Sequence, residues 1–199
     1  MRYKVIELIV TCCYIGKINF APGTLGSLLA FPIFILLSHM FLLSGYVLPL
    51  QNYSLIESQI ITYVCFVVIG TALIFICGVI TSAIYIKDTN QDDPKEIVID
   101  ELVGQLLTIT LTILIGPLLW NNGISQGISA NFIDFVAMYF MPFVLFRLFD
   151  IIKPWPIDYI DRNMKTGLGI MLDDVVASIL ASISSYAIVF LIIQYYGEV

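Results

Sequence analysis

The sequence predicts an all-α, polytopic membrane protein with about five transmembrane helices and a short N-terminal interfacial helix. Of the 199 residues, 59% are hydrophobic and only 12% are charged. A soluble domain has about a quarter of its residues charged, and a core of this size could not hide so much apolar surface from water. The apolar runs are long and lack alternation, which excludes a membrane β-barrel with strands of about ten residues.

Five apolar runs are long enough, or nearly so, to cross a hydrocarbon core of roughly 30 Å as helices of about 20 residues. They cover residues 25–48, 60–86, 97–119, 132–152 and 170–195. The fourth run has a short apolar centre because it contains Asp134, Arg147 and Asp150. No internal repeat separates the runs, so we expect a single membrane-embedded domain over residues 1–199.

The N-terminal stretch "MRYKVIELIVTCCYIGK" begins like a signal peptide, with basic residues before an apolar segment. Glu7 interrupts that segment and no small-residue cleavage site follows it. We therefore expect the stretch to be retained as a short interfacial helix, with residues 5–15 either lying on the membrane or dipping into it.

The distribution of basic residues predicts the orientation. When the five helices are threaded up and down, every lysine and arginine falls on one side of the membrane. These residues are Arg2, Lys4, Lys17, Lys87, Lys95, Arg147, Lys153, Arg162 and Lys165. The positive-inside rule places this side in the cytoplasm. The N-terminus is then cytoplasmic and the C-terminus lies outside.

Carboxylates gather on the same side. Asp100 and Glu101 open the third helix, Asp150 closes the fourth, and Asp173 and Asp174 open the fifth. A carboxylate in a first turn can simply complement the helix dipole, but this explains neither Asp150 nor the adjacent pairs. Clustered carboxylates need a counter-charge, and Mg²⁺ is the hard cation that takes oxygen ligands and bridges to phosphate.

Cysteine and histidine contribute no pattern of this kind. The cysteines show no metal-binding spacing, and we expect all four, Cys12, Cys13, Cys65 and Cys77, to be buried apolar thiols. The single histidine, His39, lies near the far end of the first helix. We expect it to be non-catalytic, which excludes a phosphohistidine intermediate.

Basic and hydroxyl groups on the acidic side suit a phosphate. Arg147 shares a helical face with Asp150, and its guanidinium fork matches a phosphate. Lys153 follows one turn later and Arg162 lies in the next segment, although basic residues at helix ends also reach toward lipid headgroups. The segment "PGTLGS" supplies Gly23, Thr24 and Ser27 at a helix N-terminus, the parts of an anion cradle.

Three blocks carry a family resemblance: "APGTLGSLLA", "IVIDELVGQ" and "FRLFDIIKPWPIDYIDRNMKTGLGIMLDDVVAS". They resemble bacterial phosphatidylglycerophosphatase A over about a quarter of the chain. The resemblance implies an Mg²⁺-dependent phosphatase of the inner membrane, which converts phosphatidylglycerophosphate to phosphatidylglycerol and inorganic phosphate. Thr166 and Ser178 stand where the family commonly has glycine, and neither change removes a charge.

These observations predict a role for each site residue. Asp100, Glu101, Asp173 and Asp174 would hold one or two Mg²⁺ ions, with Asp150 a ligand or an orienting group. The cations Arg147, Lys153 and Arg162 would stabilise the phosphate oxygens, and Gly23, Thr24 and Ser27 would hold the phosphate. Attack by water and an aspartyl-phosphate intermediate both remain open.

Two other classes fit less well. A transporter should have polar or broken helices near the membrane midplane, whereas these charges lie at one end. A CDP-alcohol phosphotransferase should contain D-x₂-D-G-x₂-A-R, which the sequence lacks. We expect a phospholipid substrate in the membrane and no nucleic acid partner, and the sequence leaves the oligomeric state open.

Overall fold

A computed structural model describes residues 2–91, 94–121 and 130–197, and all regular structure in these ranges is helical. The elements follow one another along the chain as α1 (Arg2–Val10), η1 (Ile15–Lys17), α2 (Pro22–Leu28), α3 (Ala30–Ser44), α4 (Leu55–Thr89), α5 (Ile99–Thr112), α6 (Ile115–Asn121), α7 (Ala130–Phe135), the π-helical η2 (Val136–Phe140), α8 (Met141–Ile152), α9 (Ile157–Asn163) and α10 (Gly167–Gly197).

Five helical stretches are long and apolar enough to cross a membrane, which confirms the predicted all-α polytopic fold. They are Pro22–Ser44, Leu55–Thr89, Ile99–Leu119, Phe132–Ile152 and Gly167–Tyr195. Three of them are composite: the first joins α2 and α3, the third joins α5 and α6, and the fourth joins α7, η2 and α8. A helical N-terminal segment, α1, precedes them and packs against α4.

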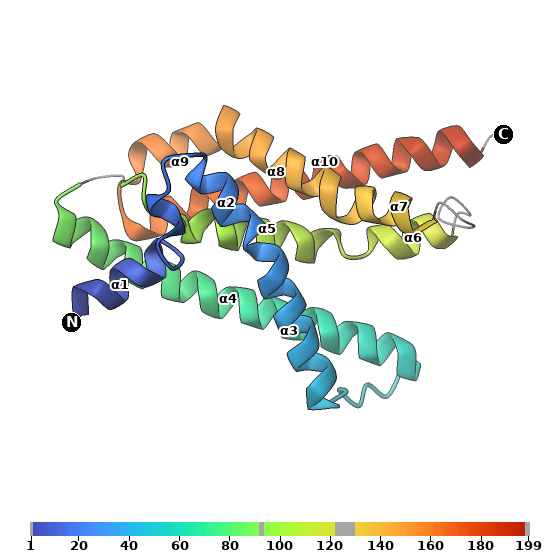
Figure 1. The fold of residues 1–199 in the computed structure, drawn as a ribbon. Helices are drawn as coiled ribbons and strands as arrows, with labels where there is room; N and C mark the ends of the chain where they lie inside the picture. The colour runs from blue at the N-terminus through green and yellow to red at the C-terminus, as the bar shows by residue number, and fades with distance from the viewer. Residues whose placement is uncertain (1, 92–93, 122–129, 198–199) are drawn as a thin grey trace.

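The centre of the bundle is α5. In its most apolar window, 61% of the residues of Ile99–Leu119 are buried inside the protein, against 17–33% for the other four stretches. Helix α10 lies against α5 and also contacts α8 and α4, while α3 and the first half of α4 extend away from this bundle as an arm (Figure 1). The residues that open α5 are therefore held by neighbours on several sides.

Gly104 allows the closest approach within the bundle. A Cβ atom at this position would lie 2.6 Å from the Phe146 ring of α8 and 3.1 Å from the Cβ of Asp174 on α10. Real Cβ contacts are not so short, so only glycine fits where these three helices meet. The crossing sets the spacing between the acidic start of α5 and Asp174.

Helix ends follow local chemistry. Ser54 caps α4 in a reciprocal capping box with Glu57. Helix α8 ends where Lys153 adopts a left-handed conformation with φ 48°, directly before Pro154, which cannot continue a helix. The Trp155–Pro156 peptide bond that follows is cis.

The structure differs from the sequence expectations in three places. The first crossing begins at Pro22 rather than at residue 25, since proline is well suited to the first turn of a helix. The segment between the fourth and fifth crossings contains a short helix, α9. Cys13, Cys65 and Cys77 are exposed and Cys12 is only partly buried, so the prediction of four buried thiols is wrong. Apolar side chains of a membrane helix also face outward, where lipid replaces a protein core.

Candidate active site

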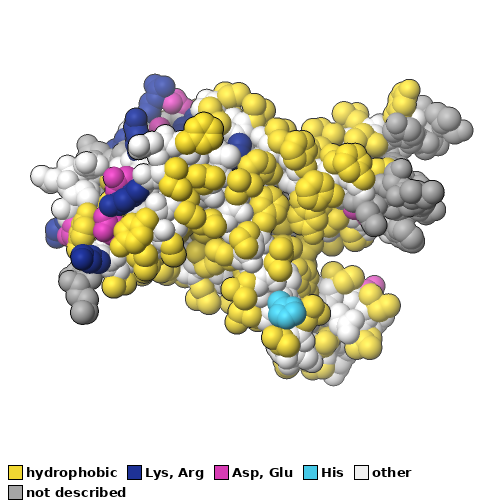
Figure 2. Space-filling view, viewed as in Figure 1, with side chains coloured by type: hydrophobic (Ala, Val, Ile, Leu, Met, Phe, Trp, Pro, Cys, Tyr) yellow, Lys and Arg dark blue, Asp and Glu magenta, His cyan; other side chains and the backbone are white. Residues whose placement is uncertain are grey.

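Charged side chains gather at one end of the molecule, where α1, α9 and the α4–α5 connection lie, and hydrophobic side chains cover most of the remaining visible face (Figure 2). A pocket of about 210 Å³ opens at this end. Its lining includes Pro22, Gly23, Pro94, Lys95, Ile97, Asp100, Glu101, Asp150, Lys153, Asp161, Ile170, Asp173 and Asp174. The pocket thus brings together the acidic and glycine motifs of four separate sequence segments.

Three carboxylates form the most compact group. Asp100 and Glu101 lie in the first turn of α5, and Asp174 lies near the start of α10. One oxygen of each lies within 4.8 Å of the others. Asp100 Oδ1, Glu101 Oε2 and Asp174 Oδ2 are buried and have no hydrogen-bond partner within the described part of the chain. Buried polar atoms are normally paired, so these oxygens are suited to a cation or to a donor from outside the chain.

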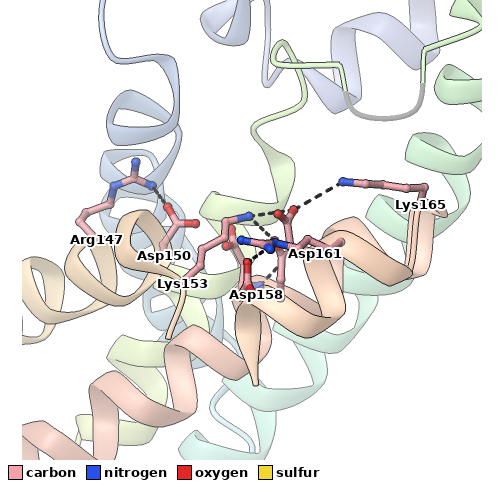
Figure 3. Close-up of polar contacts among 9 residues, drawn as sticks. Arg147, Asp150, Lys153, Asp158, Asp161 and Lys165 are labelled. Carbon is pink, nitrogen blue, oxygen red and sulfur yellow. Dashed lines mark hydrogen bonds and ion pairs between the residues drawn. The ribbon is translucent and has the colours of Figure 1, made fainter. Parts of the chain in front are cut away.

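Asp173 faces a different neighbour. Lys153 Nζ donates a hydrogen bond to Asp173 Oδ2 at 2.8 Å. It also lies 3.0 Å from Asp161 Oδ1, and Figure 3 shows this second pair. Burial by itself lowers the pKa of Lys153, but the two carboxylates outweigh burial and raise the pKa above its ordinary value. Lys153 is therefore a fixed positive charge at the pocket wall.

Arg147 links α8 to α2. Its Nη1 lies 2.6 Å from Asp150 Oδ2 and donates a hydrogen bond to Ser27 Oγ at 3.2 Å. The buried Ser27 hydroxyl in turn donates to the carbonyl of Gly23. Asp150 thus orients the Arg147 guanidinium. The positive charge of Arg147 in turn stabilises the Asp150 carboxylate near the C-terminus of α8, where the helix dipole disfavours a negative charge.

Gly23 lies directly against the carboxylate group. A Cβ atom here would clash with Glu101 Oε1 and would lie 3.1 Å from Arg147 Nη2. The absence of a side chain lets the first turn of α2 approach both groups at once. Its neighbour Thr24 is partly buried on the same turn.

Arg162 lies apart from these groups. Its Nε pairs with Asp158 Oδ1 one turn earlier on α9, and 75% of its side chain is exposed. Arg162 does not line the pocket. Its predicted role at the phosphate stays a prediction.

Sequence reasoning missed three residues of this region. Asp161 positions Lys153, and Lys95 lines the pocket from the α4–α5 connection. Gln105, one turn after Glu101, is fully buried, and neither of its amide atoms has a partner among the described residues. A polar amide inside an apolar run was a visible signal, whereas Asp161 and Lys95 looked like ordinary charges in a connecting segment.

The donor set suits a hard divalent cation. Carboxylate oxygens are the ligands that Mg²⁺ and Ca²⁺ take, and soft ligands are the ones that favour zinc. His39 lines a separate apolar cavity beside Phe34 and Tyr63. Fold and site together define a polytopic membrane protein with a carboxylate-lined pocket at one end of its helices.

Comparison with known proteins identifies the family. The phosphatidylglycerophosphatase A family model matches residues 8–189. Phosphatidylglycerophosphatase A of Escherichia coli is 32% identical over 84% of this chain and 73% of its own length. The enzyme of the same name from Haemophilus influenzae is 35% identical over 87% of this chain and 82% of its own length. The chain belongs to the phosphatidylglycerophosphatase A family and is accordingly a phosphoric monoester hydrolase.

A third, less similar relative has a different name. A Bacteroides thetaiotaomicron protein named "Putative phosphatidylinositol-3-phosphatase" is 28% identical over 82% of this chain and 80% of its own length. No solved structure matches the chain.

Proposed function

We propose that this protein hydrolyses the terminal phosphomonoester of phosphatidylglycerophosphate, giving phosphatidylglycerol and inorganic phosphate. Family membership supports the reaction class. The observation that carries the site assignment is the group of three carboxylates, each with one buried oxygen that lacks a partner among the described residues, next to Arg147 and Lys153. Cations next to carboxylates at one pocket suit a phosphate bound through a metal ion.

We assign the metal to Asp100, Glu101 and Asp174. Their unpartnered oxygens fit a small cation that prefers oxygen ligands, and Mg²⁺ is the proposed ion. When bound, Mg²⁺ would neutralise the phosphate and lower the pKa of a coordinated water. Asp173, which sequence reasoning placed among the ligands, is hydrogen-bonded to Lys153. Its position favours orienting that lysine.

The chain's own cations would stabilise the transferring phosphoryl group. Lys153 is held by Asp173 and Asp161, and Arg147 is held by Asp150 and Ser27. Such preorganised charges need little rearrangement as charge develops on the equatorial oxygens. Gly23 lets the first turn of α2 lie directly against Glu101 and Arg147.

Water is the nucleophile that the carboxylate contacts favour. Asp150 pairs with Arg147, and Asp161 and Asp173 pair with Lys153. Asp100, Glu101 and Asp174 form the proposed metal site. Each of the six lining carboxylates therefore has either a cationic partner or a proposed metal-binding role. Turnover in ¹⁸O-water with acid quenching should give labelled phosphate without a phosphoenzyme, and a trapped aspartyl phosphate would contradict direct attack.

The proposed location is the cytoplasmic side of the bacterial inner membrane. All basic residues of the sequence fall on the site's side when the five crossings are threaded. A phospholipid headgroup at this surface could enter the pocket while its acyl chains remain among the lipids.

Phosphate release by the purified protein tests the function. Phosphatidylglycerophosphate, phosphatidylinositol 3-phosphate and phosphatidic acid should be compared in uncharged detergent micelles, each with Mg²⁺ and with EDTA. We expect the highest kcat/KM on phosphatidylglycerophosphate and loss of turnover in EDTA that Mg²⁺ restores. A preference for phosphatidylinositol 3-phosphate would reassign the substrate, and full turnover in EDTA would refute the metal site.

A further inference from the structure

Among the residues that the structure describes, Lys95 is the cation of the pocket lining with no carboxylate partner. Lys153, the other lysine in the lining, contacts both Asp173 and Asp161. Arg147 nearby is paired with Asp150. Lys95 is exposed, and no ion pair joins it to another described residue. It can therefore offer its full charge to a bound anion.

The backbone around Lys95 is fixed even though its side chain is free. The Ile97 N–H donates to the Pro94 carbonyl at 3.0 Å and closes a tight turn around Lys95. The next residue, Val98, donates its N–H to the Val10 carbonyl at 2.9 Å. Pro94 adds a restricted φ angle. The chain therefore presents this lysine from an anchored turn at the pocket.

Glu96, the residue after Lys95, is hydrogen-bonded to a residue other than Lys95. Tyr85 on α4 donates a hydrogen bond from its hydroxyl to Glu96 Oε2 at 2.5 Å. The adjacent carboxylate is thus occupied and does not neutralise Lys95. The turn separates one acidic and one basic side chain, and only the basic one lines the pocket.

The proposed substrate carries two anions, and Lys95 is a second lysine in the pocket lining beside Lys153. The terminal phosphomonoester suits the carboxylate group, Arg147 and Lys153, as argued above. Phosphatidylglycerophosphate also has a phosphodiester, one glycerol unit away and nearer the acyl chains. We propose that Lys95 binds this phosphodiester and so selects lipids that carry both groups. The inference rests on the proposed function and adds a second phosphate subsite to it.

Inhibition by the two products, phosphatidylglycerol and inorganic phosphate, can distinguish the diester subsite from the monoester subsite. The lipid product retains the diester without the monoester, whereas inorganic phosphate resembles the leaving group alone. Lys95 should therefore govern inhibition by phosphatidylglycerol and not inhibition by phosphate. A lysine that is merely solvated at the surface would affect neither.

The test compares Lys95→Gln with Lys87→Gln in uncharged detergent micelles. Lys87 is exposed near the end of α4 and does not line the pocket, so it controls for general attraction of anionic lipid. We expect Lys95→Gln to raise both KM for phosphatidylglycerophosphate and Ki for phosphatidylglycerol about tenfold, as for one lost charge-assisted hydrogen bond. Its kcat and its Ki for inorganic phosphate should stay within about twofold of wild type. Lys95→Arg should restore most of the affinity.

Each other outcome overturns the subsite. Unchanged KM and Ki in Lys95→Gln, equal losses in Lys87→Gln, or no inhibition of the wild type by phosphatidylglycerol would show that Lys95 does not bind the diester. If any of these results is obtained while the wild type still hydrolyses phosphatidylglycerophosphate, the proposed function stands and only the subsite is rejected. A wild type with no turnover of that lipid rejects the proposed function and the subsite together.

Discussion

At the scale of single residues, the three carboxylates of the candidate metal site are arranged for binding rather than for stability. Asp100, Glu101 and Asp174 place oxygens within 4.8 Å of one another, where like charges repel and burial weakens screening by water. A sequence selected only for a stable fold would gain from replacing one of them with a neutral side chain. Their placement together, each with a buried oxygen, is the basis for the proposed cation.

Asp174→Asn tests whether this carboxylate contributes to activity at the expense of stability. Removing one ligand should lower phosphate release at least about a hundredfold, the scale on which a lost electrostatic group acts in catalysis. Because the substitution also relieves repulsion, the unfolding temperature in EDTA should stay equal or rise. Steady-state rates and thermal unfolding in detergent measure the two effects.

Asp158→Asn is the matched control for Asp174→Asn. Asp158 pairs with Arg162 on α9 and does not line the pocket. We expect its rate to remain within about twofold of wild type, since exposed pairs contribute little. Wild-type rates in Asp174→Asn would exclude this residue from the metal site.

Gly23→Ala tests the close approach of α2 to Glu101. The added methyl group would occupy the space of Glu101 Oε1 and press on Arg147. The carboxylate must then rotate away from Asp100 and Asp174, so we expect phosphate release to fall about tenfold or more, as small displacements in a site do. Gly70→Ala is the control, because a methyl there meets only the flexible end of Leu37. A normal rate in Gly23→Ala would show that Glu101 tolerates the shift.

The sequence predicted the acids of the site more completely than its cations. Asp100, Glu101, Asp150, Asp173 and Asp174 all line the pocket as predicted, because helix ends on one side of a membrane necessarily lie at similar depth. Which acid faces which cation depends on rotation about each helix, and hydropathy does not specify it. For that reason the Lys153–Asp173 pair was not anticipated.

The cations on connecting segments show the same limit. Lys95 lines the pocket and Arg162 does not. Both were simple charged residues between apolar runs, and only the path of each segment distinguishes them. That path depends on contacts such as the bond from Val98 to Val10, which join parts of the chain far apart in sequence.

At the scale of helices, α5, α8 and α10 depend on one another where Gly104 meets Phe146 and Asp174. A Cβ at Gly104 would lie 2.6 Å from the Phe146 ring. Gly104→Ala should therefore destabilise the protein by about 1–3 kcal/mol, the usual cost of overpacking a core. Thermal or chemical unfolding in detergent measures the loss.

A second substitution distinguishes overpacking from other causes. Phe146→Leu creates space in the same contact, so it should recover part of the stability lost in Gly104→Ala. The two changes should be strongly non-additive, as expected for residues in contact. Additive losses would mean that the methyl group acts elsewhere than against Phe146.

Hydropathy predicted the crossings well and the short helices poorly. A run of about 20 apolar residues has few alternatives to a helix in lipid, because backbone polar groups must be satisfied internally. Short helices such as α9, with seven residues, carry no comparable requirement. Ile157 on α9 is buried with Phe146, Ala177 and Ala181, so tertiary packing accounts for a helix that periodicity did not indicate.

At the scale of the whole molecule, metal binding should couple to stability. If Mg²⁺ binds the folded site and not the unfolded chain, saturating ion at about 100 times its Kd stabilises the fold by about 2.7 kcal/mol. We expect the unfolding temperature of wild type to rise with Mg²⁺ and that of Asp174→Asn to respond much less. An equal rise in both proteins would indicate that Mg²⁺ acts elsewhere.

The orientation of the molecule gives a prediction that does not depend on the site chemistry. By the positive-inside rule, the basic residues predict a cytoplasmic N-terminus and pocket and an external α3–α4 connection, residues 45–54. Single cysteines at Gln51 and Lys4 can test this in a background with the four native cysteines replaced, since three of them are exposed. A membrane-impermeant maleimide added to intact spheroplasts should label the Gln51→Cys protein, and the Lys4→Cys protein only after lysis. The reverse pattern would place the carboxylate pocket on the outer face of the membrane, away from lipid made on the cytoplasmic side. If neither protein were labelled before lysis, the five-crossing topology would be contradicted.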